Sequence, residues 1–127
     1  MTATHTPRGI VLLAHGARDP LWARPFEAVL VHLRTLSPDT PIELAFLEFM
    51  TPGLLEAGAR LAGCGEVVVV PLFLGAGGHV RKDIPALVAQ LEAAHPTITF
   101  RLSTAVGEHP TLVAALATVA LDLTRTS

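Results

Sequence analysis

The chain has 127 residues, enough for one domain with a single hydrophobic core but too few for two. Half of the residues are hydrophobic, 16% are charged and the formal net charge is −2, a composition that favours a folded globular protein and gives no support for nucleic-acid binding. The single cysteine, Cys64, excludes an internal disulfide and a cysteine-based metal motif, and we predict that it is a small buried side chain. No apolar run approaches membrane length and the first residues lack a signal-peptide pattern, so we expect a cytoplasmic protein that does not bind membranes.

The first half of the chain predicts two pairs of a strand followed by a helix. Residues 9–14 (GIVLLA) are typical of a short buried strand, and apolar residues then recur at helical spacing over residues 21–36. A second strand is predicted at residues 42–49, with Glu48 near its carboxyl end. Thr51-Pro52 suits the start of a helix that runs to about residue 61.

The second half is centred on residues 67–80 (VVVVPLFLGAGGHV). The β-branched run at its start predicts a strand that is buried on both faces. Gly75, Gly77 and Gly78 then give a backbone that a large ligand can approach closely, and His79 follows directly. The remaining elements are a helix at roughly 82–94, a strand near a sheet edge at 97–102 and a helix at 112–123.

Strands that alternate with helices of this length predict an α/β fold, a small four-stranded parallel-sheet βαβ domain. We expect a single domain over residues 9–124 and a disordered N-terminal tail over residues 1–8.

Metal-binding side chains follow several of the predicted strands. His15 follows the first strand, Glu48 ends the second, His79 follows the third, and Glu108 with His109 follows the fourth. Because the carboxyl ends of parallel strands meet at one edge of a sheet, three or four of these groups are expected to face one crevice.

Two imidazoles and a carboxylate suit borderline divalent ions such as Fe²⁺, Co²⁺, Ni²⁺ and Zn²⁺. Imidazole can also exchange protons near neutral pH. The residues alone leave three possibilities open: insertion of a metal, metal-assisted hydrolysis, or a histidine nucleophile.

The motifs LLAHGARDP, ELAFLEFMTP, VVVVPLFLGAGGHVRKDIP and GEHP, in this order and spacing, resemble the short form of the CbiX-type class II chelatases. The resemblance runs from about Gly9 to the last helix and implies a domain equal to half of a two-domain class II chelatase. It also implies ATP-independent insertion of Co²⁺ or Fe²⁺ into the tetrapyrrole sirohydrochlorin, in cobalamin or siroheme biosynthesis. The metal, with Ni²⁺ as a further candidate, would be a substrate, and no organic cofactor is expected.

The resemblance also implies roles for individual residues. The family's two functional histidines match His15 and His79, and its acidic residue at the end of the second strand matches Glu48. These three would bind the metal, and the two histidines would be catalytic. Arg18, Arg81 and the glycines at 75, 77 and 78 would bind the carboxylate-rich tetrapyrrole. Ala17 is a departure, because the family often has serine there.

Two other functions are compatible with parts of the pattern. A non-catalytic metal carrier could use the same histidines and carboxylate. The His-Gly-x-Arg element is similar to that of histidine phosphatases, but those enzymes need an arginine where this chain has Ala14. Since longer chelatases contain two such halves, we also expect a homodimer.

Overall fold

Four parallel strands form the centre of the molecule. The structure is a computed structural model that describes residues 7–75 and 77–125, without the side chains of residues 79–81. The sheet has the strand order β2-β1-β3-β4, so that β4 lies at an edge as predicted. The strands are β1 (Arg8–Ala14), β2 (Ile42–Phe46), β3 (Glu66–Pro71) and β4 (Thr99–Leu102).

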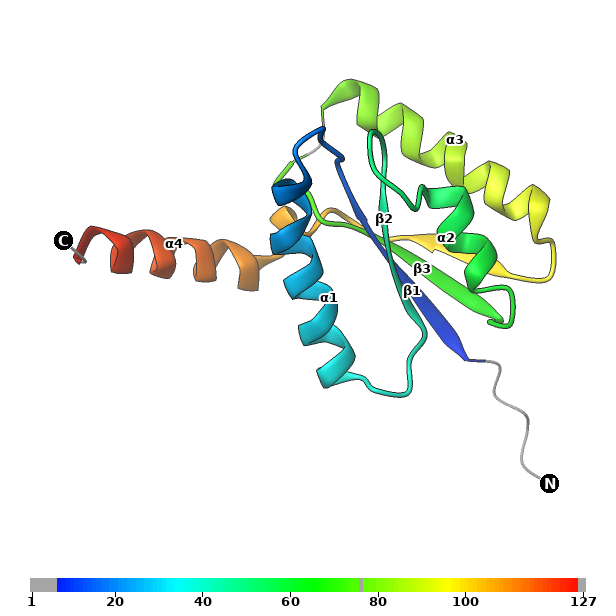
Figure 1. Cartoon of the computed structure of the whole chain (residues 1–127), viewed down its shortest axis with the longest axis horizontal. Coiled ribbons are helices and arrows are strands. Elements are labelled where there is room, and N and C mark those ends of the chain that lie inside the picture. The colour runs from blue at the N-terminus through cyan, green and yellow to red at the C-terminus, as the bar shows by residue number, and fades with distance from the viewer. Residues whose placement is uncertain (1–6, 76, 126–127) are drawn as a thin grey trace.

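Helices lie on both faces of this sheet (Figure 1). Helix α1 (Arg24–Leu36) packs on one face, whereas α2 (Leu54–Arg60) and α3 (Gly78–Ala94) pack on the other. Two short 3-10 helices, η1 (Pro20–Ala23) and η2 (Val106–Glu108), precede α1 and α4 (Pro110–Arg125). The predicted α/β class with a four-stranded parallel sheet and four α-helices is confirmed.

The alternation of side chains along β1 divides the core into two layers. Val11 and Leu13 join the cluster under α2 and α3, whereas Leu12 and Ala14 join the cluster under α1. All four are at most 3% exposed, because β1 has a strand on each side and helices on both faces. Cys64 is also buried in the first layer, as predicted, and burial raises the pKa of its thiol.

Several predicted boundaries were wrong by two or more residues, and three of them lie close to the candidate site residues. Strand β2 ends at Phe46, so Glu48 lies in the following turn. Helix α2 begins at Leu54 because the carbonyl of Pro52 accepts a hydrogen bond from the Phe46 N–H, which folds the Thr51-Pro52 pair back onto β2. Helix α3 begins at Gly78, since Gly77 is extended and occupies the N-cap position.

Helix α4 has no buried residue, and unlike α1, whose Phe26, Leu30 and Leu33 pack against the core, it adds no side chain to either core cluster of the described residues. It points away from the sheet and its layers (Figure 1). Within residues 7–75 and 77–125, no helix is long and apolar enough to cross a membrane.

Candidate active site

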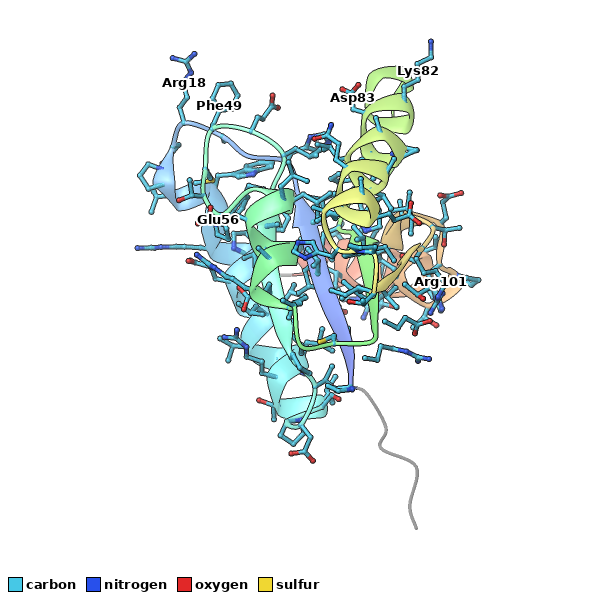
Figure 2. All side chains as sticks on the ribbon, turned by 90° about the vertical axis from the view of Figure 1, so that its right-hand side faces the viewer. Arg18, Phe49, Glu56, Lys82, Asp83 and Arg101 are labelled. Carbon is cyan, nitrogen blue, oxygen red and sulfur yellow. The ribbon has the colours of Figure 1, made fainter. Side chains whose placement is uncertain are left out.

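The candidate site lies at the carboxyl edge of the sheet, where the segments that leave the four parallel strands come together. Figure 2 shows Arg18 and Phe49 at one corner of this edge, and Lys82 and Asp83, from the start of α3, at the opposite corner. Residues from two different strand exits and one helix start therefore share one end of the molecule.

His15 is held in place by an aromatic neighbour. It directly follows β1, is half-buried, and stacks on the ring of Phe73 with 4.3 Å between the ring centroids and 27° between the planes. Its carbonyl oxygen accepts a 2.7 Å hydrogen bond from the indole N–H of Trp22. Since Phe73 lies two residues before Gly75, the imidazole lies beside the beginning of the glycine segment.

The loop after β1 crosses the turn after β2 at Gly16. A Cβ atom added to Gly16 would lie 1.4 Å from the carbonyl oxygen of Glu48, so only glycine permits this approach. The turn itself is tight, because the Glu48 carbonyl accepts a 2.8 Å hydrogen bond from the Met50 N–H and Phe49 has a φ of 64°. The backbones of residues 15–16 and 48 thus meet, and the side chain of Glu48 is exposed.

Arg18 and Phe49 form a pair on this corner. The guanidinium carbon of Arg18 lies 5.1 Å from the centroid of the Phe49 ring, a cation–π geometry. Phe49 is 62% exposed, and Arg18 is also exposed. Among the described residues, the ion pairs involve neither Arg18 nor Lys82, so neither basic group is neutralised by a carboxylate partner.

The glycine segment leads directly into α3. A Cβ atom added to Gly75, Gly77 or Gly78 would meet no atom within 4 Å, so this backbone borders open space. The backbone of His79 lies in the first turn of α3, because the helix begins at Gly78 and not at the predicted residue 82. The side chains of His79 and Arg81 lie outside the described part of the chain.

A pocket of about 300 Å³ lies between the glycine segment and the segment after β4. Phe73, Gly75, Ile84 and Pro85 line one side, and residues 102–105 with Glu108 line the other. Glu108 therefore faces this pocket, whereas His109 lines a separate groove on the other side of the same segment.

The sequence matches the CbiX family over residues 9–122, nearly the whole chain. The chain belongs to the CbiX family. The sirohydrochlorin cobaltochelatase of Methanopyrus kandleri is 32% identical to it over 81 residues, which cover 62% of this chain and 57% of the relative. The enzyme of the same name from Saccharolobus solfataricus is 37% identical over 83 residues, covering 63% of this chain and 62% of the relative. The matched part is thus under two thirds of the length of either relative.

A crystal structure shows the same architecture in another CbiX protein. The protein from Marinobacter aquaeolei VT8, described in connection with cobalamin (vitamin B12) biosynthesis, is 38% identical and superposes with a TM-score of 0.79. The superposition covers 94% of this chain and 100% of the other. The resemblance inferred from the sequence motifs is therefore confirmed for the family and for the fold.

Metal ligation in this CbiX chain remains a prediction. In the part of the chain that the structure describes, no three His, Cys, Asp or Glu side chains form a group that could hold a metal ion. The predicted set of His15, Glu48 and His79 includes a side chain outside that part. What the structure establishes is that the backbones of residues 15–16 and 48 meet and that His15 lies beside the segment leading to residue 79.

Sequence reasoning missed Phe49 as a site residue. The run IELAFLEF suggests a strand that continues to residue 49, and this hides the turn in which Phe49 is exposed beside Arg18. The available signal was Pro52 three residues later, which is unfavourable for a continuing strand.

Proposed function

We propose that this chain is a sirohydrochlorin chelatase that inserts Co²⁺ or Fe²⁺ into the tetrapyrrole without ATP. The observation that carries the proposal is the half-buried His15, stacked on Phe73 beside an open glycine segment that ends in the first turn of α3. The names of the relatives from Methanopyrus and Saccharolobus support the substrate, and membership of the CbiX family supports the reaction.

The open sheet edge suits a large flat ligand with carboxylates on its rim. The pocket of about 300 Å³ is at the lower limit of small-molecule sites, so a tetrapyrrole would lie over the edge with one side in the pocket. Phe49 and Leu74, 62% and 68% exposed, offer apolar surface to the ring. Arg18, Arg81 and the free N–H groups at the start of α3 would bind carboxylates.

Metal insertion requires two pyrrole N–H protons to leave as the ion enters. In the proposed mechanism, the imidazole of His79 first holds the ion, and after the ion has passed to the ring nitrogens its freed lone pair accepts one of the two protons. His15 is the second base for the other proton, with or without having served first as second ligand. Glu48 would bind the ion on its way in or transfer protons to solvent from its exposed position. General-base assistance of this kind contributes about two to four powers of ten in rate.

Metal selectivity is expected to be weak. A set of two imidazoles and one carboxylate distinguishes poorly between Co²⁺ and Fe²⁺, and Ni²⁺ would bind at least as tightly. We propose that the supply of metal in the cell, rather than the ligand set, decides which ion is inserted.

The test is the initial rate of insertion, followed by absorbance under anaerobic conditions, for wild type and for His15→Ala and His79→Ala. We expect His79→Ala to lose at least roughly 100-fold in rate and His15→Ala to lose less, because His79 and Glu48 could still hold the ion. Tetrapyrrole binding, measured by fluorescence quenching, should persist in both variants, since the ring is held by its carboxylates and faces.

A suitable control is His95→Ala. His95 is half-buried at the far end of α3, where its ring lies 6.4 Å from that of Phe100. Insertion by His79→Ala at the rate of this control would refute the mechanism. Metal binding without any insertion by the wild type would instead favour the non-catalytic carrier, and release of phosphate from phosphate esters would favour the phosphatase.

A further inference from the structure

The loop after β1 ends in a short helix that has no buried residue. Helix η1 begins with Pro20, directly after its N-cap residue Asp19. Asp19 fixes the turn through two hydrogen bonds: its Oδ1 accepts one of 2.9 Å from the Leu21 N–H, and its carbonyl accepts one of 3.0 Å from the Trp22 N–H. The cap therefore sets the direction in which the side chain of Trp22 leaves the backbone.

Trp22 uses its indole nitrogen on the backbone of His15. The Nε1–H group donates a 2.7 Å hydrogen bond to the His15 carbonyl, seven residues earlier in the chain. Trp22 is 43% exposed, so burial alone gives little reason for so large a side chain at this position. A phenylalanine could supply apolar contact but has no donor. The hydrogen bond is therefore the specific contribution of tryptophan.

The indole is also fixed to the core layer under α1. Its ring lies 5.5 Å from that of Phe26 in α1, and Phe26 meets the buried ring of Phe46 edge to face at 6.4 Å. Phe46 belongs to the core cluster on the α1 face of the sheet, whereas Phe73 belongs to the cluster on the opposite face. His15 is thus attached to both layers, through its ring to one and through its carbonyl to the other.

The two attachments fix different properties of His15. Stacking on Phe73 defines the plane of the imidazole, but a ring can slide and turn within that plane without losing the contact. Binding an ion or accepting a proton depends on where the lone pair of a ring nitrogen points, which is a direction within the plane. That direction follows from the side-chain torsions and so from the orientation of the backbone, which the Trp22 hydrogen bond holds.

We propose that Trp22 is a positioning residue for His15 and that Asp19 is the cap that holds Trp22 in place. Residues 15–22 then form a closed loop, in which the chain leaves His15, turns at the cap and returns an N–H group to the carbonyl where it began. Asp19 acts through the backbone of η1 and not as an acid or a metal ligand. The inference rests on the proposed role of His15 and adds the side chains on which that role depends.

Replacing a single N–H group tests the hydrogen bond. Because Trp22 is the only tryptophan, biosynthetic incorporation of an analogue changes one side chain. Benzothienylalanine has sulfur in place of the indole N–H and almost the same shape, and fluorotryptophan keeps the N–H as the control. We expect kcat for insertion to fall roughly five- to tenfold in the benzothienyl protein, with KM for the tetrapyrrole within about twofold of wild type. The fluorotryptophan protein should match wild type.

Asp19 offers a second variant, which leaves the indole unaltered. Asp19→Ala removes the cap and should lower kcat about threefold or more, whereas Asp19→Asn keeps an oxygen that can accept the Leu21 N–H and should restore at least about half of the rate. An aspartate that acted as acid or ligand would not be rescued by asparagine. Asp39→Ala is the matched control, since Asp39 is exposed in the turn between α1 and β2, at the other edge of the sheet.

An NMR measurement tests the positioning without any chemistry. The imidazole of His15, assigned by its absence from the spectrum of His15→Ala, should have a high order parameter in wild type. The order parameter should fall in the benzothienyl protein and in Asp19→Ala. A wild-type protein that inserted no metal would refute the proposed function, and these order parameters would still decide whether Trp22 positions His15.

Three results would overturn the inference. The first is an unchanged order parameter for His15 in the benzothienyl protein, whatever its rate. The second is a raised KM with an unchanged kcat in that protein, which would mean that the side chain of Trp22 contacts the tetrapyrrole instead of holding His15. The third is an Asp19→Asn protein as slow as Asp19→Ala, which would mean that the charge of Asp19 matters and not its cap.

Discussion

His15 and Phe73 show how a single aromatic contact can position a reactive group. The imidazole stacks on a ring that is itself 4% exposed and belongs to the main core cluster. Because side chains in a packed core are confined to few rotamers, Phe73 transmits the rigidity of the core to a residue at the open edge. The direction of the imidazole therefore depends on packing as well as on the loop after β1.

Replacing Phe73 with leucine should separate positioning from folding. The change keeps an apolar side chain, so we expect a loss of about 1 kcal/mol in the free energy of unfolding, but it removes the stacked ring and should slow insertion roughly tenfold. The control is Phe100→Leu, which alters a ring of similar burial in the same cluster beside His95 instead of His15. Insertion rates and thermal melts would be measured for both variants. Equal insertion rates would show that Phe73 does not position His15.

Gly16 is the second residue on which the geometry of the edge depends. Gly16→Ala would place a methyl group 1.4 Å from the Glu48 carbonyl oxygen, so the two loops must separate. We expect a loss of about 2 kcal/mol or more in the free energy of unfolding by urea, accompanied by loss of activity. Gly63→Ala is the control, since a Cβ there meets nothing within 4 Å, and it should change stability by less than about 0.5 kcal/mol.

At the scale of elements, α2 and α3 approach closely at Gly58. A Cβ at this position would lie 2.3 Å from Cδ2 of Leu91, which is fully buried and has no room to move. Alanine improves helix propensity by about 1 kcal/mol over glycine, and overpacking costs about 1–3 kcal/mol. Because the clash is severe, we expect the cost of overpacking to exceed the gain in helix propensity.

The expected result for Gly58→Ala is a net loss of about 1–2 kcal/mol, measured by urea unfolding. In a double-mutant cycle with Leu91→Ala, the two changes should partly compensate, because the smaller side chain at 91 makes room for the methyl group. If the changes in the free energy of unfolding of the two single variants simply add up in the double variant, the two side chains do not clash, and the helices must have moved apart at this contact.

The sequence predicted elements better than boundaries. Four strands, four helices and the edge position of β4 follow from hydrophobic periodicity, which reports burial. The start of α3 was placed four residues too late, because glycines favour loops in isolation while here Gly77 caps the helix and Gly78 begins it. The end of β2 was placed too late because the run at 42–49 remains apolar through a turn that tertiary contacts impose.

The candidate site was also predicted only in part, because tertiary contacts decide the rest. Parallel topology was enough to bring the segments of His15, Glu48 and the glycines to one edge. The stacking on Phe73, the approach of Gly16 to Glu48 and the exposure of Phe49 depend on loop conformations, and local sequence patterns do not encode them.

For the whole molecule, the homodimer expected from the sequence would make stability dependent on concentration. If two chains associate in the folded state, mass action favours the folded dimer as protein concentration rises. We expect the midpoint of thermal unfolding to rise by several degrees over a hundredfold increase in wild-type concentration. A constant midpoint for the wild type over this range would contradict the expected homodimer.

The segment after β4 has two surfaces. Ser103, Thr104 and Ala105 line the pocket at the sheet edge and also the groove beside α1, and Gly107 fits so closely against Leu74 that an added Cβ would lie 1.8 Å from its carbonyl oxygen. An occupant of either cavity thus restricts the same few residues. Thermodynamic reciprocity then requires that any factor by which an occupant of the groove tightens ligand binding in the pocket be the factor by which that ligand tightens binding in the groove. A molecule bound in the groove beside α1 would therefore change the affinity of the proposed site from the opposite side of a segment that both cavities share.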